Sequence, residues 1–177
     1  MRIREELVVD GPAVRRVVTA AFAGEPVVAD LVDALRSSSA WRPGLSLVAD
    51  DGGEVVGHVL ATRGWLDAPH ALVEVLVLSP LSVHPSQQGQ GIGGGLVRAL
   101  LARAAQRTEP AMFLEGSPGY YGRFGFEPAG PAGIRRPSLR IPEPAFQVKW
   151  LPAQTPELTG TLVYPEPFWA LDLVGLR

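Results

Sequence analysis

The chain of 177 residues contains no cysteine, and this absence excludes several kinds of chemistry at once. Disulfide bonds, thiolate metal sites and a cysteine nucleophile are all ruled out. The three histidines share no spacing with a carboxylate that would indicate a metal motif, so we expect no metal. Lys149 is the only lysine and lies far from the glycine-rich stretch, which argues against a nucleoside-triphosphate loop of Walker type.

Strong net charge and long apolar runs are missing too. The formal net charge is −2, which gives no electrostatic reason to expect a nucleic-acid or membrane partner. No apolar run reaches the roughly 20 residues of a membrane span. The opening segment MRIREELVVDG carries charge and lacks the apolar core of a secretion signal. We therefore expect a cytoplasmic protein, in which 46% hydrophobic residues supply a substantial core.

The order of apolar segments predicts a mixed α/β or α+β domain. Apolar residues recur at helical spacing over 14–22, 28–35 and 92–104. Short apolar runs predict strands at 2–7, 45–49, 54–61, 72–78, 111–115, 146–151 and 160–163. The run at 72–78 is apolar throughout and is expected to be central, with an interruption at Ser79-Pro80 before it resumes at 81–83.

The most informative segment is LSVHPSQQGQGIGGGLVRALL, residues 81–101. Its glycines crowd a turn and the first positions of the helix that follows, at 89, 91, 93, 94 and 95. Each glycine inside a helix costs roughly 0.5–1 kcal/mol of stability relative to alanine. Because the segment bears this cost, we expect its bare backbone to lie close to another group. A helix N-terminus presents free N–H groups and a positive dipole end. The segment therefore predicts a phosphate-bearing ligand at this turn.

One fingerprint in this segment is that of dinucleotide-binding proteins. Gly89-x-Gly91-x-x-Gly94 matches the pattern, and Glu115 follows about 20 residues later, where an acid would hold the ribose. However, residues 84–88 separate the preceding strand from the first glycine, and hairpin-like strands come before it. An NAD-type dinucleotide-binding protein therefore remains an alternative.

A second fingerprint overlaps the first. Val83-x-Pro85-x-x-Gln88-x-x-Gly91-x-Gly93 resembles the acetyl-CoA-binding motif of the GCN5-related N-acetyltransferase (GNAT) superfamily. Downstream, the segment from Tyr121 to Phe126 resembles the superfamily's Y-x-x-x-G-F motif. The stretches PGYYGRFGFEPA, FQVKWL and GTLVYPEPF resemble the YhbS-like subgroup of bacterial N-acetyltransferases. Two motifs in the right order favour this reading.

The resemblance implies a fold and a binding site. The fold is a mixed central sheet with splayed parallel strands flanked by helices, as one domain over 1–177 whose proline-rich part, 130–177, completes the sheet and the acceptor side. The resemblance also implies acetyl-CoA as co-substrate. Its pantetheine arm would pair with Leu81, Ser82 and Val83. Its pyrophosphate would lie on the amides of Gln88, Gly89, Gln90, Gly91, Ile92, Gly93 and Gly94.

The implied reaction is direct acetyl transfer to a primary amine within a ternary complex. Tyr121 matches the family's general acid, and the Val83 amide is the candidate donor to the thioester carbonyl. The general base is open between Glu74 and water, while His84 is expected to be a loop residue. The acceptor is a small-molecule, peptide or protein amine, and a homodimer is possible. A non-catalytic acyl-CoA sensor on the same fold remains a further alternative.

Overall fold

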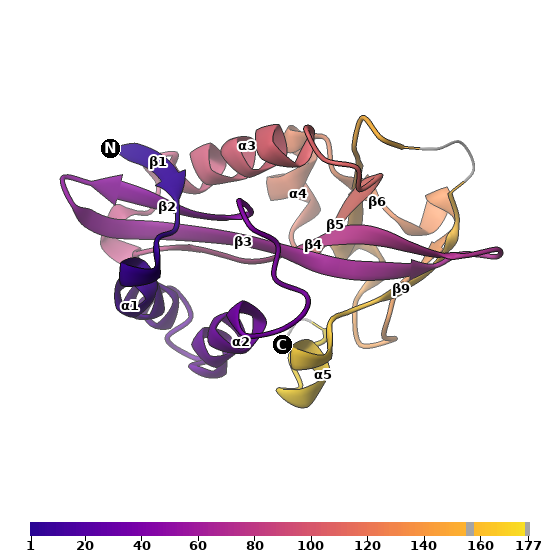
Figure 1. Ribbon diagram of the computed structural model, residues 1–177, viewed down its shortest axis with the longest axis horizontal. Coiled ribbons are helices and arrows are strands. Elements are labelled where there is room, and N and C mark those ends of the chain that lie inside the picture. Colours follow the sequence, from indigo (N-terminus) through magenta and orange to yellow (C-terminus); the bar gives the residue numbers. More distant parts are fainter. Residues whose placement is uncertain (155–157, 176–177) are drawn as a thin grey trace. The chain divides into compact units, whose positions relative to one another are not determined.

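The computed structural model describes residues 1–154 and 158–175 (Figure 1). The described chain forms two compact units. The first unit comprises residues 1–61 and 79–104, and the second comprises 62–78 and the described part of 105–177. Strands β3 (Glu54–Asp67) and β4 (Leu72–Val83) each contribute one part to either unit. Each unit is therefore described by itself.

The first unit combines a short antiparallel sheet with three helices. Its elements are β1 (Arg2–Glu5), a 3-10 turn at Val8–Asp10, α1 (Gly11–Ala21), α2 (Val27–Arg36), β2 (Ser46–Asp51), the first part of β3, the end of β4, a 3-10 turn at Pro85–Gln87 and α3 (Ile92–Ala104). Strand β2 pairs antiparallel with both β1 and β3. Helices α1 and α2 pack together on one face of these strands and α3 covers the other face (Figure 1).

Helix α3 is held close to the sheet at two glycines. A Cβ atom at Gly57 of β3 would come within 3.0 Å of Leu96 and within 3.3 Å of the Ser82 carbonyl oxygen. A Cβ atom at Gly95 would come within 3.0 Å of Ile3 on β1. These close approaches place the first turn of α3, and hence the glycine-rich turn before it, against the ends of β3 and β4.

The second unit is dominated by strands. Its elements are the end of β3, the start of β4, β5 (Ala111–Glu115), α4 (Pro118–Tyr121), a 3-10 turn at Gly122–Phe124, β6 (Glu127–Pro128), a 3-10 turn at Gly130–Ala132, β7 (Ile134–Arg135), a 3-10 turn at Glu143–Ala145, β8 (Phe146–Trp150), β9 (Gly160–Val163) and α5 (Glu166–Ala170). Strand β8 pairs antiparallel with β5 and β6, while β9 pairs antiparallel with β3 and parallel with β7. The proline-rich part thus supplies β7, β8 and β9.

The parallel pairing of β4 with β5 is short. It joins Leu76 to Met112 and Val77 to Phe113, whereas β5 pairs with β8 over its whole length, from Ala111 to Glu115. This brief contact fits the expectation of parallel strands that part. The expected interruption at Ser79-Pro80 is wrong, because β4 runs continuously from Leu72 to Val83 through this cis peptide bond.

Candidate active site

The turn before α3 depends on two glycines in the left-handed region. Gly89 has φ +77° and Gly91 has φ +82°, values that residues with a Cβ atom rarely adopt. Both residues are exposed, and a Cβ atom built on either would meet nothing within 4 Å. The glycines are therefore required by the backbone path and not by crowding, and the space above them is open to a ligand.

The amides of this turn are unused. Within the described residues, the six consecutive N–H groups from Gly89 to Gly94 donate no hydrogen bond, and the bonded series resumes where Gly95 donates to the Gly91 carbonyl oxygen at 2.9 Å. The Gln88 amide is already bonded, at 3.3 Å, to the carbonyl oxygen of Pro85. The first turn of α3 contains no acidic residue. An exposed turn of free amides at a helix N-terminus is suited to a phosphate group.

Side chains and backbone groups fix the start of this turn. The His84 amide donates to the Val56 carbonyl oxygen at 2.9 Å, and His84 Nδ1 lies 2.8 Å from the Ser86 hydroxyl. Gln88 Nε2 donates to the Val83 carbonyl oxygen at 3.1 Å. His84 therefore serves the loop, as the sequence suggests, and Gln88 ties the turn to the end of β4.

The end of β4 carries the other residues that the resemblance assigns to a cofactor. Leu81 and Val83 are half-buried, whereas the side chain of Ser82 points into the interior and donates a long hydrogen bond, 3.4 Å, to the His58 carbonyl oxygen. The alternation of a strand therefore leaves Leu81 and Val83 on the same, more accessible side. Ser82 contributes packing and backbone groups only.

In the second unit, Tyr121 ends the short helix α4 and is half-buried. Its ring meets the rings of Tyr120 and Phe126 edge-on, with centroid distances of 4.9 and 5.8 Å. Tyr120 has a second partner as well, because the Arg123 guanidinium lies 4.1 Å above its ring. The two tyrosines thus contact each other, but only Tyr120 also contacts Arg123, and only Tyr121 matches the family motif.

Burial raises the pKa of Tyr121 above its ordinary value of 10, and the nearby Tyr120 raises it further. Within the described residues, the Tyr121 hydroxyl makes no hydrogen bond. A phenol in this state is fully protonated at neutral pH and has its proton available to a ligand.

The candidate bases lie in different surroundings. Glu74 is half-buried on β4. Glu115, at the end of β5, accepts hydrogen bonds from the Tyr164 hydroxyl and from the Gly175 amide, the latter at 3.1 Å. Burial raises the pKa of Glu115, although these bonds oppose the rise. Its carboxylate is thus engaged by the C-terminal part of the chain, so it is not placed as a ribose ligand.

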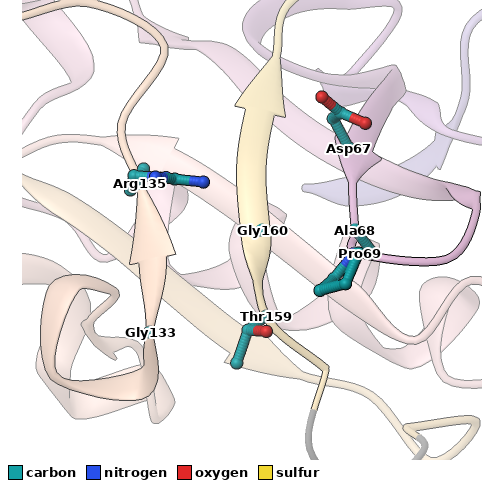
Figure 2. A pocket seen from close by; sticks show the side chains of 7 residues that line it. All are labelled: Asp67, Ala68, Pro69, Gly133, Arg135, Thr159 and Gly160. Carbon is teal, nitrogen blue, oxygen red and sulfur yellow. The ribbon is translucent and has the colours of Figure 1, made fainter.

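A surface pocket of about 510 Å³ lies elsewhere in the second unit, lined by Asp67, Ala68, Pro69, Gly133, Arg135, Thr159 and Gly160. Figure 2 shows Asp67 and Arg135 on opposite sides of β9. Both pair in register with Thr161, whose hydroxyl accepts from Arg135 Nε at 3.1 Å. None of the residues expected to hold a cofactor or to act in catalysis lines this pocket.

The fold and the glycine turn define a class of protein. The family described as "Acetyltransferase (GNAT) domain" matches residues 9–129, and the chain belongs to this family. It is therefore an acyltransferase, with the α+β fold of that family: a mixed, mostly antiparallel sheet flanked by helices.

Individual relatives cover nearly the whole chain. The uncharacterized N-acetyltransferase YjhQ of Escherichia coli (strain K12) is 38% identical over 166 residues, 89% of this chain and 88% of YjhQ. A crystal structure of the GNAT family N-acetyltransferase YhbS from Escherichia coli in complex with CoA has a TM-score of 0.84 and 31% identity, covering 94% of this chain and 91% of YhbS. A GNAT family acetyltransferase from Brucella melitensis in complex with acetyl-CoA has a TM-score of 0.76 and 32% identity, covering 94% and 97%.

These similarities give no support to the dinucleotide-binding and sensor alternatives. Over residues 1–154 and 158–175, no helix is long and apolar enough to cross a membrane. The same residues contain no cluster of three or more histidine, aspartate or glutamate side chains that would hold a metal ion.

Proposed function

We propose that this protein transfers an acetyl group from acetyl-CoA to a primary amine, by direct transfer within a ternary complex. The observation that carries the proposal is the run of six unbonded amides from Gly89 to Gly94, which begins with three exposed residues before α3, in a GNAT family member. The related structures named above contain CoA or acetyl-CoA, which supports the same cofactor here.

Two neighbouring segments of the first unit would hold the co-substrate. The amides from Gly89 to Gly94 suit the pyrophosphate, because they are free and no Cβ atom stands over Gly89 or Gly91. The half-buried residues Leu81 and Val83 would offer backbone groups to the amides of the pantetheine arm, which would lie along β4 as an added strand.

For this reaction the protein has to position the two substrates and supply one proton to the leaving group. A neutral amine nitrogen forms a bond to the acetyl carbon, and the bond from that carbon to sulfur breaks. The Val83 amide would donate to the carbonyl oxygen, where negative charge develops. Tyr121 would give its proton to the departing thiolate. Its raised pKa ensures that the phenol carries that proton throughout the neutral range.

The acceptor amine must lose a proton before or during attack. Glu74 or a water molecule is proposed for this step, because Glu115 is engaged by Tyr164 and Gly175. The acceptor is proposed to be a small-molecule, peptide or protein amine, with residues 130–177 on its side of a single domain. A cytoplasmic location and a homodimer stay predictions.

The test is acetyl transfer by the purified protein, followed as thiol release from acetyl-CoA in the presence of representative amines. The panel comprises a polyamine, an aminoglycoside, free amino acids and peptides with a free N-terminus or a lysine. With an accepted amine, Tyr121→Phe should lower kcat by roughly 10²–10⁴-fold with little change in the KM for acetyl-CoA.

Tyr120→Phe is the matched control. It removes a hydroxyl from the adjacent residue while keeping both the ring that faces Arg123 and the burial that is the main cause of the raised Tyr121 pKa, so kcat close to wild type is expected. Wild-type kcat in Tyr121→Phe would remove Tyr121 from the mechanism. Tight acetyl-CoA binding without turnover of any amine would favour the sensor alternative.

A further inference from the structure

The ring of Tyr121 lies against the bare backbone of Gly116. A Cβ atom built on Gly116 would stand 2.4 Å from Tyr121 Cε2 and 2.7 Å from Cδ2. Contacts under 3.0 Å are essentially never made by real Cβ atoms, so no other residue fits at position 116 unless the ring moves. Gly116 does not have a positive φ, so the close approach alone requires glycine there.

The Gly116 peptide is itself held on both sides. Its amide donates to the Ala145 carbonyl oxygen at 2.9 Å, and its carbonyl oxygen accepts from Gln147 Nε2 at 2.9 Å. Gln147 is only 1% exposed, on β8. A buried amide side chain is costly unless its hydrogen bonds are made, and this one is directed at the residue beneath the tyrosine ring.

The segment between Gly116 and Tyr121 is short and closed. The Tyr121 amide donates to the Ser117 carbonyl oxygen at 3.0 Å, and the Phe126 amide donates back to the Tyr121 carbonyl oxygen at 3.4 Å. The ring of Phe126 meets the ring of Tyr121 edge-on. The backbone of the tyrosine is thus fixed, and its ring is bounded by Tyr120, by Phe126 and by the bare backbone of Gly116.

We infer that Gly116 and Gln147 are positioning residues that form a seat for Tyr121 and fix where its hydroxyl lies. This inference rests on the proposed role of Tyr121 as proton donor. Neither residue touches the reacting atoms. They act through Tyr121, so their loss is expected in kcat and in the placement of the ring, with the KM for acetyl-CoA unchanged.

Gly116→Ala tests the seat directly. The ring would have to retreat by about 1 Å to reach an ordinary contact distance, and a displacement of that size at a catalytic group costs about a hundredfold in rate. Gly119→Ala is the matched control, because Gly119 lies in the same segment, in α4, and the nearest atom that a Cβ atom there would meet beyond its chain neighbours is Ser117 Oγ at 3.8 Å. It should keep wild-type kcat.

A double-mutant cycle separates positioning from general damage. In a Tyr121→Phe background, Gly116→Ala should cause little further loss of kcat, because the hydroxyl that it displaces is already gone. An undiminished loss in that background would show that Gly116 acts independently of Tyr121, and unchanged kcat in the single variant would show that no seat is needed. Either result overturns the inference.

A readout without turnover keeps this inference distinct from the proposed function. The chain has three tyrosines, so ring-labelled tyrosine gives three assignable sets of NMR signals. Gly116→Ala should shift the Tyr121 signals, and Gly119→Ala, whose new Cβ atom does not reach Tyr121, should not. If the Tyr121 signals shift but Tyr121→Phe is fully active, Gly116 does position the ring, and Tyr121 is not the proton donor. Unshifted Tyr121 signals in Gly116→Ala would show that Gly116 does not position the ring.

Gln147→Met provides a second route if Gly116→Ala does not fold. Methionine has similar volume and no amide, so the Gly116 carbonyl oxygen loses its partner while the β8 side of the core stays filled. A smaller fall in kcat and a smaller shift of the Tyr121 signals are expected. If neither kcat nor the Tyr121 signals change, Gln147 does not help to position Tyr121.

Discussion

Gln88 and Val83 are joined across the turn that follows β4, where Gln88 Nε2 donates to the Val83 carbonyl oxygen at 3.1 Å. The bond links the start of the glycine-rich turn to the strand end proposed to line the pantetheine arm. Both residues belong to the motif that indicated a cofactor in the sequence. The side chain of Gln88 thus shapes the turn, while its backbone amide is used by Pro85.

Gln88→Leu is expected to raise the KM for acetyl-CoA about fivefold, because one hydrogen bond that orders the turn is lost, at a cost of about 1 kcal/mol. The measurement is steady-state kinetics with varied acetyl-CoA. Gln106→Leu, the same change at an exposed glutamine after α3, controls for the substitution itself. Equal KM values for the two variants would show that the tie to Val83 does not matter.

The rate of acetyl transfer is expected to rise with pH and to stay on a plateau until at least pH 10. The rise reflects deprotonation of the acceptor amine. The plateau follows because burial raises the pKa of Tyr121, so the phenol keeps its proton throughout this range. The measurement is kcat/KM for the amine between pH 6 and pH 10.5, with protein stability checked at each pH. An alkaline fall centred below pH 10 would contradict the assignment of Tyr121.

Acid should destabilise the first unit through a buried network of Glu6, Ser46, His58 and Arg36. Glu6 accepts from the Ser46 hydroxyl and from Arg36 at 2.6 Å, and His58 Nε2 lies 2.9 Å from the Ser46 oxygen. Burial lowers the pKa of His58. Burial alone would raise the pKa of Glu6, but hydrogen bonds from His58 and Ser46, together with the nearby Arg36 charge, lower it.

Because both pKa values are lower in the folded state, the unfolded chain binds more protons in acid. The ordinary pKa values, taken for the unfolded chain, are 6.5 for His58 and 4.5 for Glu6. The stabilisation from this network should therefore be fully present above pH 6.5. It should fall in two stages, from pH 6.5 downward for His58 and from pH 4.5 downward for Glu6. Thermal unfolding at constant ionic strength measures this. His58→Gln should remove the first stage, while His70→Gln, at an exposed histidine, should leave it. An identical pH slope in both variants would contradict the account.

The glycine turn and α3 were predictable because their signals are local. Glycines at 89 and 91, followed by apolar residues at helical spacing, specify a turn and a helix within a short stretch of chain. Ile92, Leu96, Leu100 and Ala104 are all buried, as their spacing predicts. The position of Glu115 at the end of β5 was predictable in the same way.

What the sequence did not reveal depends on contacts between distant segments. Strand β3 continues to Asp67, beyond the predicted end at residue 61, because its second part pairs with β9 almost a hundred positions later. The partners of Glu115 are the Tyr164 hydroxyl and the amide of Gly175, the latter 60 positions away. The tight fit of Gly116 to the Tyr121 ring could not be read either, because a glycine before Ser117-Pro118 reads as an ordinary turn residue.

The most direct test of the account is thermal stabilisation by acetyl-CoA of three proteins: wild type, Gly91→Glu and Gly52→Glu. Gly52, in the turn between β2 and β3, also has positive φ, +65°, and open space around it, so both variants carry the same strain of about 1–2 kcal/mol. Only Gly91→Glu adds a side chain and a negative charge to the proposed phosphate site.

At about 100 times the dissociation constant, acetyl-CoA should stabilise wild type and Gly52→Glu by ~2.7 kcal/mol, and should leave the midpoint of Gly91→Glu unchanged. A parallel titration with NAD should produce no shift. A full acetyl-CoA shift in Gly91→Glu, or a shift with NAD alone, would contradict the claim that this turn binds the acetyl donor.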